Sequence, residues 1–141
     1  MQTIPSLGHA EAQKAIEVIQ AELLKRGLTA VITVADSHGE LIAMLRLDGA
    51  PLPSIQIAAN KAWTAARERQ PSREIGKKVR DPQHGFDIAY YGDPKMVGWG
   101  GGIPVVVAGV VVGAVGVSGL PQEVDMELAQ LGVEAIQAMN Q

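Results

Sequence analysis

A run of glycines precedes the most apolar stretch of the chain. Gly100, Gly101 and Gly102 are consecutive, and residues 103–117 that follow are mostly valine, alanine and glycine. Backbone without side chains suits a sharp bend or a β-bulge, and it equally allows a ligand to lie against main-chain N–H groups. Successive N–H groups can form a nest for an anion or a developing oxyanion. The run therefore predicts a place of close approach, and both interpretations stay open.

Lys61 lies in a pattern of alanines at helical spacing, which places it beside the core. A lysine with apolar neighbours can hold a carboxylate or phosphate, or act as a base or Schiff-base amine if its pKa is lowered. The competing interpretation is a snorkelling lysine that pairs with an acidic neighbour. We favour anion binding, which makes Lys61 a cofactor-binding residue or, in an enzyme, a catalytic one.

The chain has three histidines and no cysteine, so few side chains could hold a haem iron. His84 lies in a segment without periodicity that leads to the glycine run, and it could be a ligand or a general acid/base. His9 falls in the first turn of the first predicted helix, where the helix dipole keeps an imidazole neutral. We take His84 or His9 as the possible haem-iron ligand, with an ordinary surface histidine as the alternative for each.

Aromatic residues gather before the glycine run. Phe86, Tyr90, Tyr91 and Trp99 lie within 14 residues of a chain that is 4% aromatic. Such rings could cover a flat ligand or form a contact between subunits. We place Trp99 among the cofactor-binding residues, together with the glycine run.

Composition excludes several classes of protein. With 141 residues the chain predicts a single domain, and a net charge of -3 with scattered basic residues predicts no nucleic-acid partner. The apolar stretch 103–117 is shorter than the roughly 20 residues that span a bilayer, so we expect no membrane partner. We expect a cytoplasmic protein, because there is no cysteine and no signal-peptide pattern.

The periodicity predicts alternating helical and extended segments. We expect a helix capped by Ser6, a second helix capped by Ser54, a third near Pro121, and hairpins over 28–47 and 105–117. The second hairpin lacks alternating polar residues, so burial on both faces is expected. These elements predict an α+β fold, a three-layer α/β/α sandwich around a largely antiparallel sheet of about five strands.

Several motifs in this order resemble one known family. They are Val34-Ala35-Asp36, Gly39-Glu40-Leu41, the stretch 44–51, Ser54-Ile55, the stretch 60–65 that includes Lys61, the stretches 100–104 and 113–119, and Asp125. Together they resemble the haem-binding GlcG/HbpS-like family, which also occurs as the C-terminal domain of some corrinoid adenosyltransferases. The resemblance implies a compact domain that assembles into dimers or larger rings, with haem as the cofactor of some members. Asn60 stands where the family usually has aspartate, and segment 81–97 departs from the pattern.

We therefore expect a small ligand-binding protein, haem-binding or accessory to a catabolic pathway, that forms a homo-oligomer. The alternative is a cofactor-independent isomerase or lyase acting on a small carboxylated intermediate. In that enzyme Lys61 would hold the carboxylate, the glycine run would stabilise an enolate or oxyanion, and His84 would move the proton. Both hypotheses assume one pocket that these three features share.

Overall fold

The computed structural model describes all 141 residues and contains a four-stranded sheet with four α-helices. The elements in chain order are α1 (His9–Arg26), β1 (Val31–Asp36), β2 (Leu41–Arg46), α2 (Ser54–Glu68), α3 (Ser72–Val79), the 3-10 helix η1 (Ile88–Tyr91), β3 (Gly102–Val107), β4 (Val110–Ser118) and α4 (Gln122–Met139). No helix has both the length and the apolar character needed to cross a bilayer.

The strand order is β2-β1-β4-β3, and each neighbouring pair is antiparallel. The predicted α+β class and antiparallel sheet are confirmed. The expected strand number of about five is wrong, because segment 83–96 forms turns and η1 and adds no strand. Burial of the second hairpin on both faces holds for most of β4. It is wrong for β3, which is an edge strand and leaves Val106 exposed.

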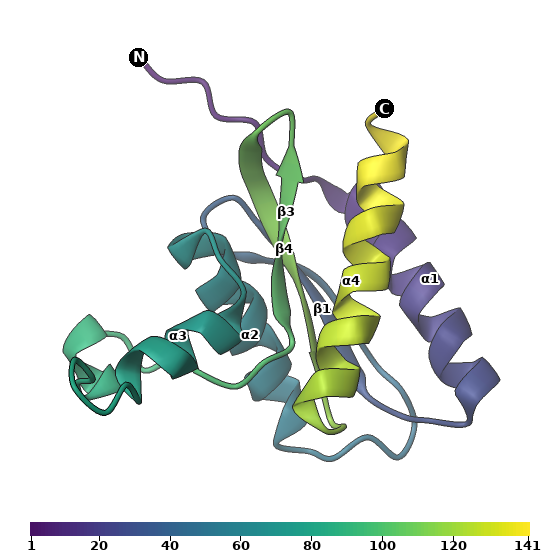
Figure 1. Cartoon of the computed structure of the whole chain (residues 1–141). Helices are drawn as coiled ribbons and strands as arrows, with labels where there is room; N and C mark the ends of the chain where they lie inside the picture. Colours follow the sequence, from purple (N-terminus) through teal and green to yellow (C-terminus); the bar gives the residue numbers. More distant parts are fainter.

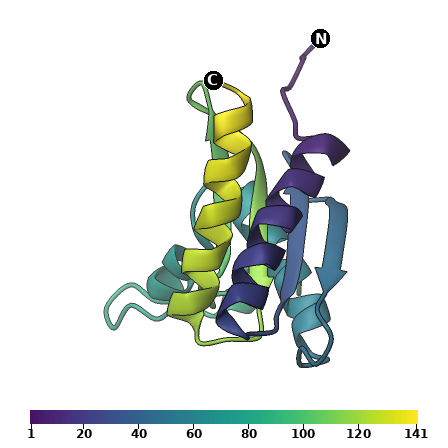
Figure 2. The same ribbon diagram turned by 90° about the vertical axis from the view of Figure 1, so that its right-hand side faces the viewer.

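Helices cover both faces of the sheet (Figure 1). Along β1, Ile32 and Val34 belong to the large core cluster that includes buried residues of α1 and α4. The alternate residues Val31 and Ala35 pack against α2, because successive side chains of a strand point to opposite faces. Turned by 90°, the molecule shows α1 and α4 side by side in front of the sheet (Figure 2).

Glycines let α2 lie directly on the sheet. A Cβ atom on Gly102 would collide with the backbone carbonyl of Lys61, and one on Gly116 would collide with that of Ala58. On the same face, Thr33 Oγ1 donates a hydrogen bond of 2.8 Å to Ala58 O. This contact fixes the height of α2 above β3 and β4, and with it the place of the Lys61 side chain.

Two predicted helix caps are wrong. The first helix begins at His9 with Gly8 at its N-cap, because the Ser6 hydroxyl instead accepts a hydrogen bond from the Ser37 N–H at the hairpin turn. Ser54 is the first residue of α2, after Pro53, and its hydroxyl caps nothing. Ser6 thus ties the N-terminal segment to the hairpin, and Ser54 is left free for other contacts.

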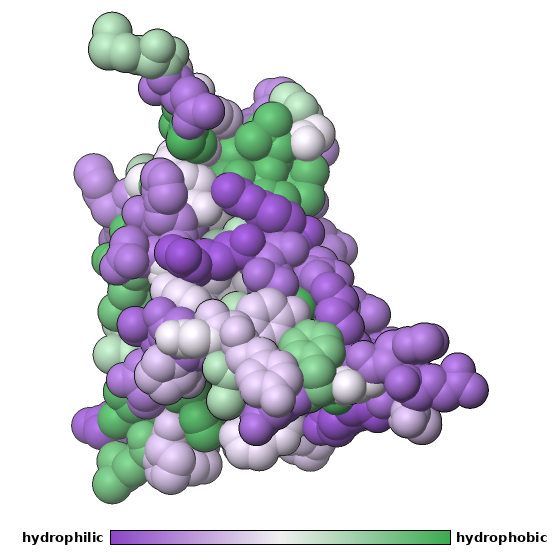
Figure 3. Space-filling view, turned by 90° about the vertical axis from the view of Figure 1, so that its left-hand side faces the viewer, coloured by the Kyte–Doolittle hydropathy of each residue, from purple (hydrophilic) through white to green (hydrophobic).

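Segment 81–97 projects beside α3 as a series of turns. Aspartate side chains hold these turns: Asp81 accepts hydrogen bonds from two backbone N–H groups, and Asp87 and Asp93 from one each. Figure 3 looks onto the side of the molecule that carries α3 and η1, and it shows aromatic rings gathered on this face among polar side chains. The segment is therefore held by turn chemistry and, at Lys95 and Val97, by hydrogen bonds with the Thr64 hydroxyl of α2, and not by pairing with the sheet.

Candidate functional site

A buried ion pair joins two helices that lie on opposite faces of the sheet. Lys61 in the middle of α2 and Asp125 in the first turn of α4 are 3% and 1% exposed. The distance from Lys61 Nζ to Asp125 Oδ2 is 3.0 Å. The pair meets just beyond the end of β4, where Lys61 Nζ also donates a hydrogen bond of 3.0 Å to Val117 O. Lys61 is therefore inside the core, and not beside it as the helical spacing predicted.

The carboxylate is held on its second oxygen as well. Asp125 Oδ1 accepts a hydrogen bond of 3.2 Å from Leu120 N, in the turn that leads into α4. Burial raises the pKa of Asp125 above its ordinary value and lowers the pKa of Lys61, while their mutual attraction opposes both shifts. The pair thus fixes α4 against α2 at a desolvation cost that its own hydrogen bonds offset.

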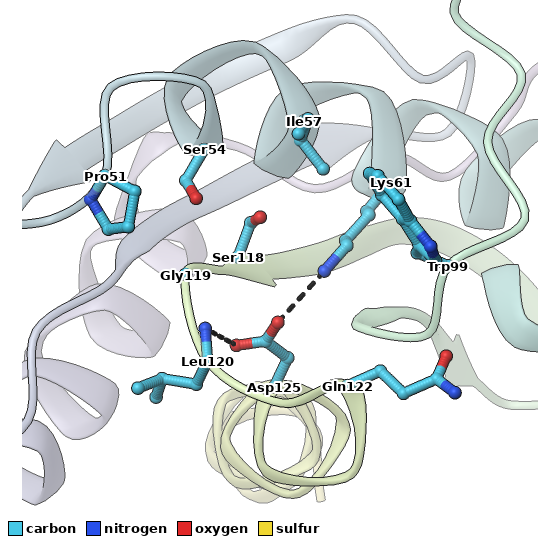
Figure 4. Close-up of a pocket in the computed structure, with 10 residues that line it drawn as sticks. All are labelled: Pro51, Ser54, Ile57, Lys61, Trp99, Ser118, Gly119, Leu120, Gln122 and Asp125. Carbon is cyan, nitrogen blue, oxygen red and sulfur yellow. Dashed lines mark hydrogen bonds and ion pairs between the residues drawn. The ribbon is translucent and has the colours of Figure 1, made fainter.

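The ion pair borders a cavity of about 470 Å³ (Figure 4). We call it the polar pocket; its lining is Pro51, Ser54, Ile57, Lys61, Trp99, Ser118, Gly119, Leu120, Gln122 and Asp125. Ser54 and Ser118 come from α2 and the last position of β4, and the close-up shows both hydroxyls turned toward the open space. The volume falls within the range of about 300–1,000 Å³ that small-molecule sites occupy.

The glycine run lies against Lys61, and none of its three glycines lines the polar pocket. Gly101, at φ 133°, approaches so closely that a Cβ atom there would lie 2.8 Å from Lys61 Nζ. Gly100 N donates to Gln122 Oε1 and Gly102 N donates to Ser72 Oγ, each at 2.9 Å. These two N–H groups are bonded within the protein, which is the arrangement of a structural bend and leaves no row of free donors for an anion.

A second cavity, of about 370 Å³, lies between α3 and the 86–99 segment. We call it the apolar pocket; its lining is Gly76, Val79, Arg80, Phe86, Ile88, Met96, Val97, Gly98 and Trp99. Arg80 bonds to the backbone carbonyls of Gly76 and Gly98 and forms no ion pair. Trp99, 55% exposed, lines both pockets and marks the boundary between them.

The predicted histidines lie outside both linings. His84 is exposed in the turn after Asp81, whose carboxylate accepts from its backbone N–H, and it precedes Phe86 of the apolar pocket by two residues. His9 is exposed at the start of α1, near the first residues of β4, because neighbouring Leu7 bonds to Val112. The polar pocket lies at the opposite end of β4. The structure therefore places Lys61 and Trp99 at one pocket, with Gly101 packed against Lys61, and separates both histidines from them.

The sequence predicted no ligand-binding role for Asp125 or for the two serines of the polar pocket, and Ser54 was expected only as a helix cap. One signal was present for the carboxylate: Asp125 precedes Leu128 and Ala129 by three and four residues, so helical spacing places it on the apolar face of α4. An acidic residue on a buried face needs a partner, and Lys61 was the candidate. The serines carried no comparable signal.

Comparison with known proteins identifies the family of this chain. The sequence model described as haem degrading protein HbpS-like matches residues 7–134. The chain belongs to the HbpS-like family. The resemblance to GlcG/HbpS-like proteins is thereby confirmed, and both walls of the polar pocket lie within the matched residues.

Relatives and solved structures agree with membership in the HbpS-like family. An uncharacterized 15.0 kDa protein from the dhaT-dhaS intergenic region of Citrobacter freundii is 35% identical over 133 residues, 94% of each chain. The crystal structure of Klebsiella pneumoniae protein ORFY has a TM-score of 0.92 at 30% identity, covering 98% of this chain and 95% of that one. A complex of PduOC with haem has a TM-score of 0.85 at 25% identity, covering 92% and 94%.

The isomerase or lyase hypothesis gains no support from these relatives. It also required Lys61, the glycine run and His84 to meet at one substrate, and His84 does not line the pocket that contains Lys61. The charge of Lys61 is already met by Asp125.

Proposed function

We propose that this HbpS-like protein binds haem in the apolar pocket and serves as an accessory protein of a catabolic pathway. The observation that carries the proposal is the pairing of an apolar, partly aromatic wall with one unpaired cation, Arg80. A flat macrocycle bearing carboxylates is complementary to this combination of surfaces. The similarity in fold to the PduOC–haem complex supports the choice of haem among such ligands.

The residues of the apolar pocket are of the types that bind haem. Phe86 and Trp99 present exposed rings that a macrocycle can cover, and the guanidinium of Arg80 suits a propionate carboxylate. Met96 lines the pocket and His84 lies in the adjoining turn, and thioether and imidazole are both common haem-iron ligands. Haem would supply redox and oxygen chemistry, while these residues bind it and limit the access of water.

A hemin titration followed by the Soret band tests the proposal. We expect a shifted band that saturates at one hemin per chain, and weaker binding by Phe86→Ala and Arg80→Ala. His84→Ala and Met96→Leu identify the iron ligand, because replacing that ligand changes the position of the band. His9→Ala is the control, since His9 lies at the far end of β4. Weak absorbance that never saturates and is the same in all variants would contradict the proposal.

We further propose that the protein is a cytoplasmic homo-oligomer. The edge strand β2 leaves Leu41 and Met44 50% and 43% exposed, and an edge strand with one unpaired side and apolar side chains is a frequent place of subunit contact. Light scattering coupled to gel filtration should give the mass of a dimer or larger ring. Leu41→Glu should lower that mass, whereas a monomeric wild type would contradict the proposal.

A further inference from the structure

Two buried hydroxyls face the polar pocket without a partner in the protein. Ser54 and Ser118 are 5% and 4% exposed, yet neither Oγ forms a hydrogen bond with another residue. No buried side-chain oxygen is sealed off without a partner, so both hydroxyls must open to the cavity. They face each other across it, Ser118 from the strand and Ser54 from the helix (Figure 4). A hydroxyl both donates and accepts, so this pair suits a ligand that does the same.

The Lys61 ammonium has one proton left to donate into the pocket. The Lys61 ammonium has three protons, of which Val117 O and Asp125 Oδ2 accept two. The remaining proton can go to an oxygen atom in the cavity. Gln122 uses its Oε1 on Gly100 N, which leaves its amide NH₂ as a further donor at the rim.

The net charge of the lining excludes a preference for anions. Lys61 and Asp125 are the charged residues of the lining, and they neutralise each other. A carboxylate ligand would lose hydration on entering the pocket and would meet no net positive charge in return. A neutral molecule carries no such desolvation cost, and Pro51, Ile57 and Leu120 offer apolar surface for its carbon atoms.

We propose that the polar pocket is a second ligand site, separate from the apolar pocket, and that it binds a small neutral molecule with neighbouring hydroxyl groups. Ser54 and Ser118 exchange hydrogen bonds with two of these hydroxyls, and Lys61 donates to an oxygen. Asp125 is a positioning residue that holds the ammonium in place. The site does not depend on haem, because its lining shares only Trp99 with the apolar pocket.

Backbone amide NMR spectra of the haem-free protein, titrated with glycerol and with glycerate, test this assignment. The two probes differ in one hydroxymethyl group that is a carboxylate in glycerate. We expect saturable shifts of the Gly119 and Leu120 amides with glycerol, and at least tenfold weaker binding of glycerate. Ser54→Ala and Ser118→Ala should each weaken glycerol binding about three- to tenfold, the effect of one lost hydrogen bond.

Ser37→Ala is the matched control, because Ser37 is a buried serine at the opposite end of β1. Shifts that do not saturate, or an affinity for glycerol that is the same in the wild type and in the Ser54→Ala and Ser118→Ala variants, would overturn the site. Glycerate binding as tightly as glycerol would overturn the assignment to neutral ligands. Hemin binding is measured separately, so either proposal can fail while the other stands.

Discussion

The polar and apolar pockets share Trp99, yet they are built from different kinds of structure. The polar pocket is walled by α2, the end of β4 and α4, and its charged pair is part of the core. The apolar pocket is walled by α3 and the turns of segment 86–99, and its cation lies at the surface. In the first pocket, the residues that would meet a ligand also stabilise the fold. In the second, the side chains of Phe86, Arg80 and Trp99 are exposed, so we expect their replacement to cost little stability.

The largest effect is expected from breaking the buried pair. Asp125→Leu leaves the Lys61 ammonium buried without its counter-charge, which should lower the free energy of unfolding by about 3–5 kcal/mol. Urea denaturation measures this loss. The double variant Lys61→Met with Asp125→Leu should recover much of it, since two apolar side chains can replace a buried pair. A double variant as unstable as Asp125→Leu would show that the loss does not come from the uncompensated charge.

The close contact between β3 and α2 should give the next effect. Gly102→Ala places a Cβ atom against the Lys61 carbonyl, and overpacking of this kind costs about 1–3 kcal/mol. Gly8→Ala is the control, because the nearest atom to a Cβ there is 3.8 Å away. Thermal unfolding should separate the two variants clearly. Equal stability would mean that α2 can move away from the sheet without cost.

The buried pair should also make stability depend on pH at both extremes. Between 3.8 and the raised pKa of Asp125, the folded state keeps a proton that the unfolded state loses, so stability falls as pH rises. Between the lowered pKa of Lys61 and 10.5, the unfolded state binds more protons, so stability rises with pH. Each slope is at most about 1.4 kcal/mol per pH unit. The measurement is the free energy of unfolding against pH for the wild type and for the Lys61→Met, Asp125→Leu double variant. The difference between the two curves isolates the contribution of the pair, and a difference that does not change with pH would contradict the prediction.

The smallest effect on stability is expected in the apolar pocket. Phe86→Ala removes a half-exposed ring whose centroid lies 5.8 Å from that of Tyr91, which should cost no more than about 1 kcal/mol. The same variant should weaken hemin binding severalfold. Urea denaturation and the Soret titration measure the two quantities. A loss of stability as large as that of Asp125→Leu would remove the distinction between the pockets.

Much of the fold could be predicted from the chain because its elements are marked locally. Helical spacing and turn residues predicted α1, α2, α4 and both hairpins, while the predicted caps at Ser6 and Ser54 were wrong, since a hydroxyl can bond to any nearby partner. The edge position of β3 could not be predicted, because the run of valines is equally apolar in an edge or a central strand.

The candidate site was predicted in part. Lys61 and Trp99 line one pocket and Gly101 lies against Lys61, whereas His84 lies outside that pocket. Ligand binding by these residues stays a prediction. Asp125 stood in a motif and yet received no role, since a carboxylate in a first helical turn is usually a solvent-exposed partner of the helix dipole.

The sequence by itself determined the elements, the family and the presence of a lysine among small residues, because these depend on neighbours along the chain. Only the tertiary structure decided that Lys61 meets Asp125, 64 residues away, and that two unpartnered serines share their cavity. The physical reason is the glycine surface of β3 and β4. Because these glycines let α2 lie against the sheet, the Lys61 ammonium reaches the end of β4, where Asp125 of α4 lies. No pattern of neighbours along the chain predicts this contact.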